Sequence, residues 1–257
     1  MNGFYGRILK VDLTQKNFTI DAVSDEVYEK YLGGKGLAAY LLSELNPPEV
    51  DPLAPENTLI FTTGPLGGST IWGSCRYGVF TKSPLTGLFT ESYSGGRTPD
   101  AIDATGFDAI VIRGQCEAPT VLTVHPEGVD FHDAGDIWGM ETYAAEDAVK
   151  ERFIRPEYRK KGAVVIGPAA ENLVRFAVVE NDYWRSAGRT GAGAVLGSKK
   201  VKAIAFRGSA PKAVADAQGL KSFNQAFAKE WIDSPAAVAY KSHGTSMMVD
   251  IVNKAQA

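Results

Sequence analysis

Asp108-Ala109-Ile110-Val111-Ile112-Arg113-Gly114 is an apolar run that ends in an arginine and a glycine, and Gly95-Gly96-Arg97-Thr98 stands shortly before it. The same arrangement returns later, as Gly188-Arg189-Thr190-Gly191 followed by Lys202-Ala203-Ile204-Ala205-Phe206-Arg207-Gly208. The two arginines of a copy are 16 positions apart in the first and 18 in the second. Such a repeat predicts a duplicated unit packed about a pseudo-two-fold axis. Chance similarity of glycine-rich turns beside strands is the alternative.

Short apolar runs bounded by turn residues extend this strand-rich pattern over most of the chain. Helical periodicity marks residues 25–45, with an interruption at Gly33-Gly34-Lys35-Gly36, and residues 141–153. The predicted strands are residues 8–13, 17–20, 59–63, 77–81, 109–114, 120–124, 163–166 and 174–178.

Near Pro211 the pattern changes, and residues 219–254 are predicted to form helices with a break at 242–245. We therefore expect an α+β domain over residues 1–210, built from the duplicated unit. Residues 211–257 would begin a second, helical domain.

Composition excludes several function classes. The chain has 257 residues, a net charge of −3 and a pI near 5.7, so it offers no basic field for nucleic acid or an anionic membrane surface. No apolar run approaches the roughly 18 residues of a membrane helix, and the first residues do not resemble a signal peptide. We therefore expect a cytoplasmic protein.

Metal ligands are scarce in the sequence. There are two cysteines, fewer than the four or so that an iron–sulfur cluster requires. The three histidines, His125, His132 and His243, are scattered and do not have the spacing of metal ligands. A redox metal would therefore have to arrive inside a cofactor.

The duplicated glycine–arginine loops favour a ligand with two similar halves. Glycine lets backbone N–H groups approach a phosphate closely, and arginine offers a planar, bidentate donor. A metal cofactor with two pterins, each carrying a phosphate, fits that description.

Several motifs in order carry a resemblance to a known family. They are Tyr5-Gly6-Arg7, Tyr31-Leu32-Gly33-Gly34-Lys35-Gly36-Leu37, Thr63-Gly64-Pro65-Leu66, Arg76-Tyr77, Thr81-Lys82-Ser83-Pro84-Leu85-Thr86-Gly87, Ile166-Gly167-Pro168-Ala169 and Gly193-Ala194-Val195-Leu196-Gly197-Ser198-Lys199. Over about residues 3–208 the chain resembles the N-terminal domain of the tungsten-containing aldehyde ferredoxin oxidoreductase family. Each motif is weak alone, and their order makes the resemblance specific.

The resemblance implies a saddle of two pseudo-symmetric β-sheets and a tungsten atom held by the dithiolenes of two pterins. It implies no catalytic residue in this chain. It also implies a magnesium ion that bridges the pterin phosphates, held by the backbone carbonyls of Tyr93 and Ser186. Tyr93 departs from the family pattern, in which asparagine is common, and Ser186 replaces a usual alanine. The cofactor-binding positions implied are Arg76, Tyr93, Gly95, Gly96, Arg185, Ser186, Gly188 and Arg189.

The activity implied is anaerobic electron transfer, in which an aldehyde is oxidised to a carboxylate and ferredoxin accepts the electrons. Further helical domains or a partner subunit would supply the iron–sulfur cluster and the acid–base residues, and the full-length protein would form a homo-oligomer. We expect no turnover by the isolated chain. Alternatives are a stand-alone pterin-cofactor carrier, a subunit without cofactor, a molybdenum enzyme, or a relative that acts on an aromatic acyl thioester.

Overall fold

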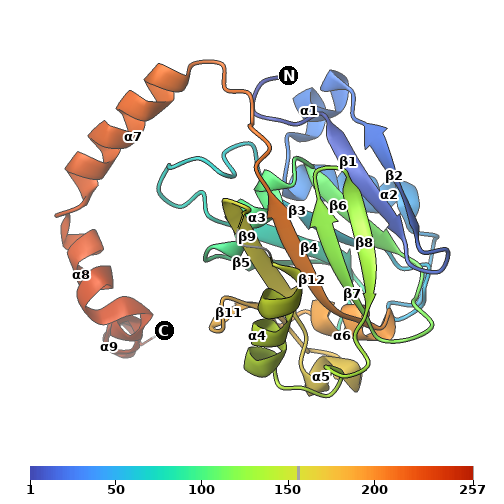
Figure 1. Cartoon of the computed structure of the whole chain (residues 1–257). Coiled ribbons are helices and arrows are strands. Elements are labelled where there is room, and N and C mark those ends of the chain that lie inside the picture. Colours follow the sequence, from blue (N-terminus) through green and yellow to red (C-terminus); the bar gives the residue numbers. More distant parts are fainter. Residues whose placement is uncertain (155–156, 257) are drawn as a thin grey trace. The chain divides into compact units, whose positions relative to one another are not determined.

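The computed structural model describes residues 1–154 and 157–256 (Figure 1). The chain forms two compact units, one made of residues 1–69 and 73–213 and the other of residues 70–72 and 214–257. The first unit contains all the strands and the second contains helices α7 to α9.

The first sheet has six strands in the order β2-β1-β6-β3-β4-β5. Only β1 and β6 run parallel, and every other neighbouring pair is antiparallel. The strands are β1 (Arg7–Asp12), β2 (Asn17–Ala22), β3 (Leu59–Thr62), β4 (Tyr77–Lys82), β5 (Phe89–Ser94) and β6 (Ala109–Arg113).

The second sheet repeats this topology. Its order, β8-β7-β12-β9-β10-β11 when read from the equivalent edge, is the first order with six added to each number. Again one pair, β7 and β12, is parallel and the rest are antiparallel. The strands are β7 (Thr120–His125), β8 (Gly128–Asp133), β9 (Lys160–Val165), β10 (Val179–Asn181), β11 (Arg185–Ala187) and β12 (Val201–Gly208). The predicted duplication is confirmed.

The helices repeat as well. Helices α1 (Asp25–Tyr31) and α2 (Lys35–Leu45) connect β2 to β3, and α4 (Thr142–Phe153) connects β8 to β9. Helix α3 (Thr98–Ala104) leads into β6, as α6 (Ala192–Ser198) leads into β12. Contacts between the halves are reciprocal: α3 packs on β9, α6 packs on β3, and the edge strands β5 and β11 lie together. Reciprocity of this kind is what an approximate two-fold relation requires.

Alternation along the strands explains the layers, because successive side chains point to opposite faces. Leu9, Phe61 and Ile110 of the first sheet share one core with Leu122 and other apolar residues of the second. The outer face of the first sheet packs against α1 and α2, and that of the second packs against α4. Both faces of the central strands are therefore buried, which gives four layers, whereas the outermost strand β2 is mostly exposed.

Other predicted elements compare with the structure as follows. The helix predicted over 25–45 is interrupted as expected, between α1 and α2. The strand predicted over 174–178 is wrong, because this segment forms turns between the short helix α5 (Pro168–Glu171) and β10. The Ala177 carbonyl accepts a hydrogen bond from Gly193 of α6 instead of from a sheet neighbour. Strands β5, β8, β10 and β11 were not predicted.

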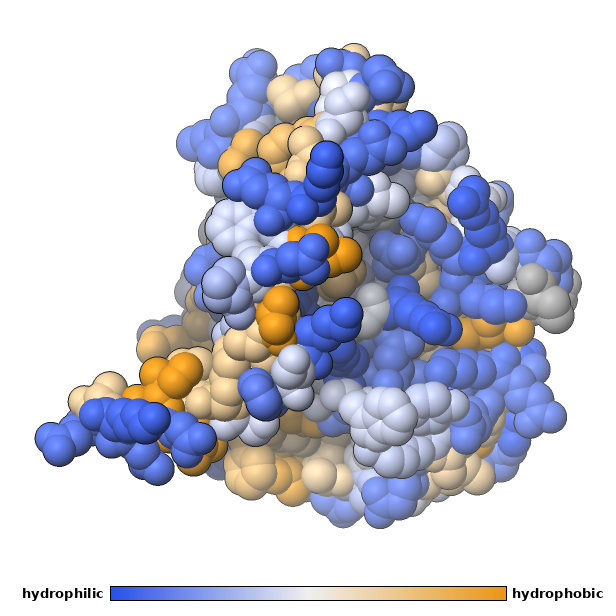
Figure 2. Space-filling model, turned by 90° about the vertical axis from the view of Figure 1, so that its left-hand side faces the viewer, coloured by the Kyte–Doolittle hydropathy of each residue, from blue (hydrophilic) through white to orange (hydrophobic). Residues whose placement is uncertain are grey.

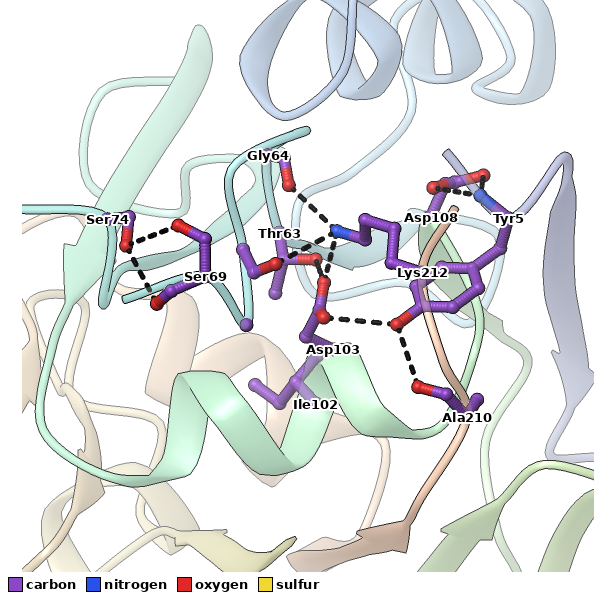
Figure 3. A network of polar contacts seen from close by, with 12 residues as sticks. Tyr5, Thr63, Gly64, Ser69, Ser74, Ile102, Asp103, Asp108, Ala210 and Lys212 are labelled. Carbon is purple, nitrogen blue, oxygen red and sulfur yellow. Dashed lines mark hydrogen bonds and ion pairs between the residues drawn. The ribbon is translucent and has the colours of Figure 1, made fainter. Parts of the chain in front are cut away.

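A buried polar network ties the end of the first unit to its sheets (Figure 3). The Asp103 carboxylate on α3 pairs with Lys212 and accepts hydrogen bonds from the Thr63 and Tyr5 hydroxyls. Lys212 also donates to the carbonyl oxygen of Gly64, at 3.2 Å. Burial and the neighbouring Asp103 carboxylate raise the pKa of Tyr5 well above its ordinary value. The network thus fixes the segment after β12 against the loop that follows β3.

The second unit is a row of short helices: α7 (Ala217–Trp231), α8 (Pro235–His243), a 3-10 turn at Gly244–Met247 and α9 (Met248–Ala255). Phe223, Phe227 and Trp231 stack along one side of α7, at helical spacing. None of these helices contains a buried residue. Among the residues described, no helix is both long enough and apolar enough to cross a membrane.

Candidate cofactor site

On the face drawn in Figure 2, hydrophobicity does not mark one continuous patch. Figure 2 shows a face that is hydrophilic over most of its area, on which hydrophobic residues emerge in separate groups. Scattered apolar side chains are ordinary at a protein surface. Charged and polar residues therefore define the candidate site.

The two predicted glycine loops come together where the edge strands β5 and β11 meet. The Ser92 hydroxyl of β5 donates a hydrogen bond to the Gly188 carbonyl at 3.0 Å and lies 2.6 Å from the Thr190 hydroxyl. Gly95 and Gly96 follow β5 directly, and Gly188 follows β11. The structure thus joins one loop from each half of the duplication.

Arg76, Gly95, Gly96 and Arg185 form one cluster of contacts. A Cβ atom added to Gly95 would lie 2.1 Å from Arg76 Nη1, so the guanidinium packs directly on this glycine. At Gly96, an added Cβ would lie 2.4 Å from Asp182 Oδ2 and 3.4 Å from Arg185 Cγ. Only glycine leaves room for these side chains beside the backbone.

The arginines of this region carry uncompensated charge. Arg76, Arg97, Arg185 and Arg189 are exposed. Within residues 1–154 and 157–256, no side chain forms a hydrogen bond or ion pair with any of their guanidinium groups. Several unpaired arginines gathered around two glycine loops create a positive field and offer bidentate donors, which favours an anionic ligand.

Asn181 at the end of β10 holds the first glycine loop in place. Its amide nitrogen donates to the Gly95 carbonyl at 2.8 Å, and its oxygen accepts from the hydroxyls of Tyr77 and Ser94 at 2.9 and 2.7 Å. Asn181 is fully buried, so these bonds satisfy groups that water does not reach. The second half of the chain therefore positions the loop of the first half.

Asp182 fixes the other side of the same loop. Its Oδ2 atom accepts hydrogen bonds from the backbone N–H groups of Arg97 and Thr98, at 2.8 and 3.1 Å. Burial opposes ionisation of Asp182, but these bonds and that from Asn181 hold its pKa below the ordinary value. The carboxylate therefore stays charged and keeps the turn before α3 rigid.

The two predicted magnesium residues lie on the joined edge strands, and their side chains are engaged elsewhere. The Tyr93 hydroxyl donates to Glu91 at 2.9 Å, and the Ser186 hydroxyl donates to Glu180 at 2.7 Å. Burial and then the Glu91 carboxylate raise the pKa of Tyr93 to about 12. Their carbonyl oxygens as magnesium ligands remain a prediction.

Protein side chains do not assemble a metal site in the part of the chain that the structure describes: no group of three or more His, Cys, Asp and Glu residues there could hold an ion. Cys75 is exposed and Cys116 is buried, and both are free thiols.

Sequence reasoning missed part of this site. Asn181 and Asp182 were not predicted to matter, and Arg97 was noted only as part of the repeat. Their signal was weak, because the segment from Asn181 to Trp184 contains no apolar alternation and reads as a loop.

Comparison with known proteins agrees with this architecture. A model of the N-terminal domain of aldehyde ferredoxin oxidoreductase matches residues 8–208. The tungsten-containing aldehyde ferredoxin oxidoreductases of Thermococcus kodakarensis and Pyrococcus furiosus are 40% and 39% identical over 255 residues, which is 99% of this chain and 42% of each relative.

A solved structure extends the likeness to a different enzyme. The active-site complex BamBC of benzoyl coenzyme A reductase, in complex with 1,5-dienoyl-CoA, aligns with a TM-score of 0.84 and 33% identity. The alignment covers 91% of this chain and 36% of the matched chain of that complex. The present chain therefore spans well under half the length of the proteins it matches. By its sequence and fold, it belongs to the aldehyde ferredoxin oxidoreductase family and corresponds to that family's N-terminal domain.

Proposed function

We propose that the first unit binds a tungsten cofactor with two pterins, as one wall of the active site of a cytoplasmic oxidoreductase. In this proposal the protein oxidises aldehydes to carboxylates and ferredoxin accepts the electrons. The observation that carries it is the set of four unpaired arginines around two joined glycine loops. The tungsten-containing relatives support the identity of the metal.

The residues present fit the phosphate ends of such a cofactor. Each charge-assisted hydrogen bond from an arginine to a phosphate oxygen contributes roughly 1.5–3 kcal/mol. Arg76, Arg185 and Arg189 would hold the phosphates, and Gly95, Gly96 and Gly188 would let the backbone approach them. The carbonyl oxygens of Tyr93 and Ser186 would bind a magnesium ion between the phosphates.

When bound, the cofactor supplies the two-electron redox chemistry. This chain's residues orient the cofactor and neutralise its charge, and none of them is assigned an acid–base role. We place the iron–sulfur cluster and the acid–base groups in further domains, in the part of the relatives' length that this chain does not span, or in a partner subunit. Those parts would also form the ferredoxin surface and the homo-oligomer interface.

A second candidate substrate class is an aromatic acyl thioester. The fold's likeness to the benzoyl coenzyme A reductase complex favours it. The same phosphate-binding residues would serve either reaction, because they contact the cofactor and not the substrate. Side-by-side assays with an aldehyde and with an aromatic acyl-CoA, on the protein with all its domains, decide between the two.

The cofactor proposal is tested with Arg76→Ala and Arg189→Ala, and with Arg159→Ala as a control at an exposed arginine outside the edge strands. Calorimetry with inorganic pyrophosphate measures the anion site directly. Cofactor loading is measured as the tungsten and pterin content per chain. The protein is produced for this in a host that makes the cofactor. We expect at least about tenfold weaker pyrophosphate binding and lower loading in the first two variants only.

Equal loading in all three variants would contradict the assignment of these arginines. Full tungsten and pterin content with lost activity would mean that Arg76 and Arg189 act in the chemistry and not in cofactor binding. We also expect the isolated 257-residue chain to give no aldehyde oxidation with a viologen acceptor. Turnover above that of a tungsten-free control would show that the chain is catalytically complete.

A further inference from the structure

A polar cavity lies beside the β10–β11 hairpin, within the first unit. Its volume is about 640 Å³, and it opens between the start of α4 and the hairpin turn. The residues that matter for its chemistry are two glutamates, three aromatic residues and a serine: Glu141, Glu180, Tyr143, Tyr183, Trp184 and Ser186. We propose that this cavity binds an organic cation, with a guanidinium group as the best fit.

The charge of the cavity is negative and uncompensated. Glu141 and Glu180 line it, and among the described residues no lysine, arginine or histidine does. Glu180 accepts one hydrogen bond, from Ser186 at 2.7 Å, and in the described chain no side chain bonds to Glu141. The amino end of α4 contributes about half a positive charge, less than two carboxylates carry.

Lys150, a lysine that lies beside the ring of Tyr183, is already engaged. Lys150 pairs with the buried carboxylate of Glu146 at 2.6 Å and lies 4.4 Å from the ring centre of Tyr183. Burial raises the pKa of Glu180, and the charge of Glu146 adds to this. A cation in the cavity would oppose both effects and favour the ionised carboxylate.

Aromatic rings complete the cation site. Trp184 is 80% exposed and Tyr143 is 50% exposed, so their faces are open to a ligand. The rings of Tyr143 and Tyr183 meet edge to face at 5.8 Å, and the rings of Tyr183 and Trp184 are 6.0 Å apart. Aromatic faces attract cations, and a planar guanidinium also stacks on them.

The hairpin turn is built to hold the Tyr183 ring in place. Asp182 and Tyr183 have φ angles of 49° and 62°, a left-handed conformation that is costly for residues other than glycine. The Glu146 carboxylate accepts both of their N–H groups, at 3.0 and 2.9 Å, and the Tyr183 hydroxyl donates to Asp147. Strain held by such contacts gathers at functional sites.

The cavity lies on the opposite side of β11 from the arginine cluster. Ser186 bonds to Glu180 in the cavity, whereas the neighbouring Arg185 contacts Gly96. Successive side chains of a strand point to opposite faces, so one strand separates an acidic site from a basic one. The cation site therefore does not depend on the proposed cofactor function.

The test measures binding of N-acetyl-arginine amide to the purified chain by calorimetry, against N-acetyl-citrulline amide. Citrulline has nearly the shape of arginine without its charge. We expect saturable binding of the arginine probe and at least about tenfold weaker binding of citrulline. Glu180→Gln and Trp184→Leu should each weaken the arginine probe, and Glu44→Gln, at an exposed glutamate of α2, should not.

Trp184 is so exposed that its replacement should not affect folding, and this keeps the test valid if Glu180→Gln is unstable. Equal binding of the two probes, absence of saturation, or wild-type binding by Trp184→Leu would each overturn the proposal. Agmatine and a blocked Gly-Arg-Gly peptide distinguish the source of the cation. Tighter binding of agmatine indicates a small amine, and tighter binding of the peptide indicates an arginine of a partner protein.

Discussion

The two sheets have one topology but different edges. In the first sheet the edge strand β5 and its neighbour β4 have six residues each, whereas their counterparts β11 and β10 have three each. The central strands carry the buried apolar side chains that build the common core. The duplicated core thus fixes where the edges meet, and the edges are free to differ and to carry the site.

Equivalent positions can even carry opposite charges. Asp108 precedes β6 and Lys202 occupies the matching position of the second copy. Asp108 accepts hydrogen bonds from the Gly6 N–H and the Tyr28 hydroxyl, at 2.8 and 2.6 Å. Lys202 pairs with Glu171 and donates to the Met140 carbonyl at 2.8 Å. Each half therefore anchors its neighbouring elements by its own polar contacts.

Breaking the anchor of the second half should have the largest effect. Lys202 is fully buried and the Glu171 side chain is 4% exposed, so Lys202→Ala leaves a buried carboxylate without its counter-charge. We expect the free energy of unfolding to fall by about 3–5 kcal/mol, measured by urea denaturation. Lys161→Ala, at an exposed lysine of β9, is the matched control. A loss of less than about 1 kcal/mol would show that the ion pair is not an anchor.

The turns before α3 and α6 differ in a testable way. Gly191 directly precedes α6 and has a φ of 84°, whereas Arg97 directly precedes α3 and has a φ of −95°. A Cβ atom on Gly191 would also lie 2.1 Å from the Arg175 carbonyl oxygen. We expect Gly191→Ala to lower the unfolding free energy by about 3 kcal/mol, from the left-handed conformation and the clash together.

Gly87→Ala separates these two causes, because Gly87 has a φ of 72° and nothing within 4 Å of an added Cβ. Its loss should be about 1 kcal/mol. Equal losses at the two positions would mean that the contact with Arg175 has no energetic weight.

The same difference between core and edge explains what could be predicted from the sequence. The runs 109–114 and 120–124 are buried apolar strands, and their pattern predicts them directly. Val174 to Val178 has a similar pattern, but the Ala177 carbonyl bonds to the start of α6, which no local signal reveals. The repeat predicted the duplicated topology because it is found by comparing two distant parts of the chain, and not from a local pattern.

Edge strands are not predicted by apolar sequence patterns. β5 reads Phe-Thr-Glu-Ser-Tyr-Ser and β11 reads Arg-Ser-Ala, so neither offers an apolar face of useful length. Tyr93, Arg185 and Ser186 were nevertheless named, because the family resemblance does not depend on hydrophobic periodicity. The contacts of Asn181 and Asp182 depend on how the two halves meet, and this is visible only in three dimensions.

A buried lysine gives the junction of the halves a pH dependence. Lys199 follows α6 and donates to the carbonyl groups of Pro55 and Gly114, at 3.0 and 3.1 Å. Burial, and then the charge of Arg113, lower its pKa to about 7. The unfolded chain binds this proton more tightly, so stability should rise with pH between about 7 and the ordinary lysine pKa.

Lys199→Met removes this titration. From pH 7 to pH 9 the unfolding free energy of the wild type should therefore rise by about 2 kcal/mol relative to that of the variant. The limit is about 1.4 kcal/mol per pH unit. Urea denaturation at both pH values measures it. A parallel pH dependence in the two proteins would show that Lys199 stays charged in the folded state.

The smallest effect on stability, below about 1 kcal/mol, is expected for Gly95→Ala. Gly95 has no left-handed φ, and the atom nearest to an added Cβ is the flexible end of Arg76, at 2.1 Å. The methyl group should therefore displace the guanidinium without unfolding the loop. If the proposed phosphate site is correct, Gly95→Ala weakens pyrophosphate binding through Arg76, by up to about the tenfold loss expected for Arg76→Ala.

A double-mutant cycle isolates that coupling. With Arg76 already replaced by alanine, Gly95→Ala has no guanidinium left to displace, so the double variant should bind pyrophosphate as Arg76→Ala does. Calorimetry on the four proteins gives the coupling directly. Additive losses would instead mean that the ligand approaches the Gly95 backbone itself, independently of Arg76. In that case the glycine of the first half would contact the anion directly and Arg76 would be a separate neighbour. This result would leave the arginines of the second half, Arg185 and Arg189, to account for the remaining charge recognition.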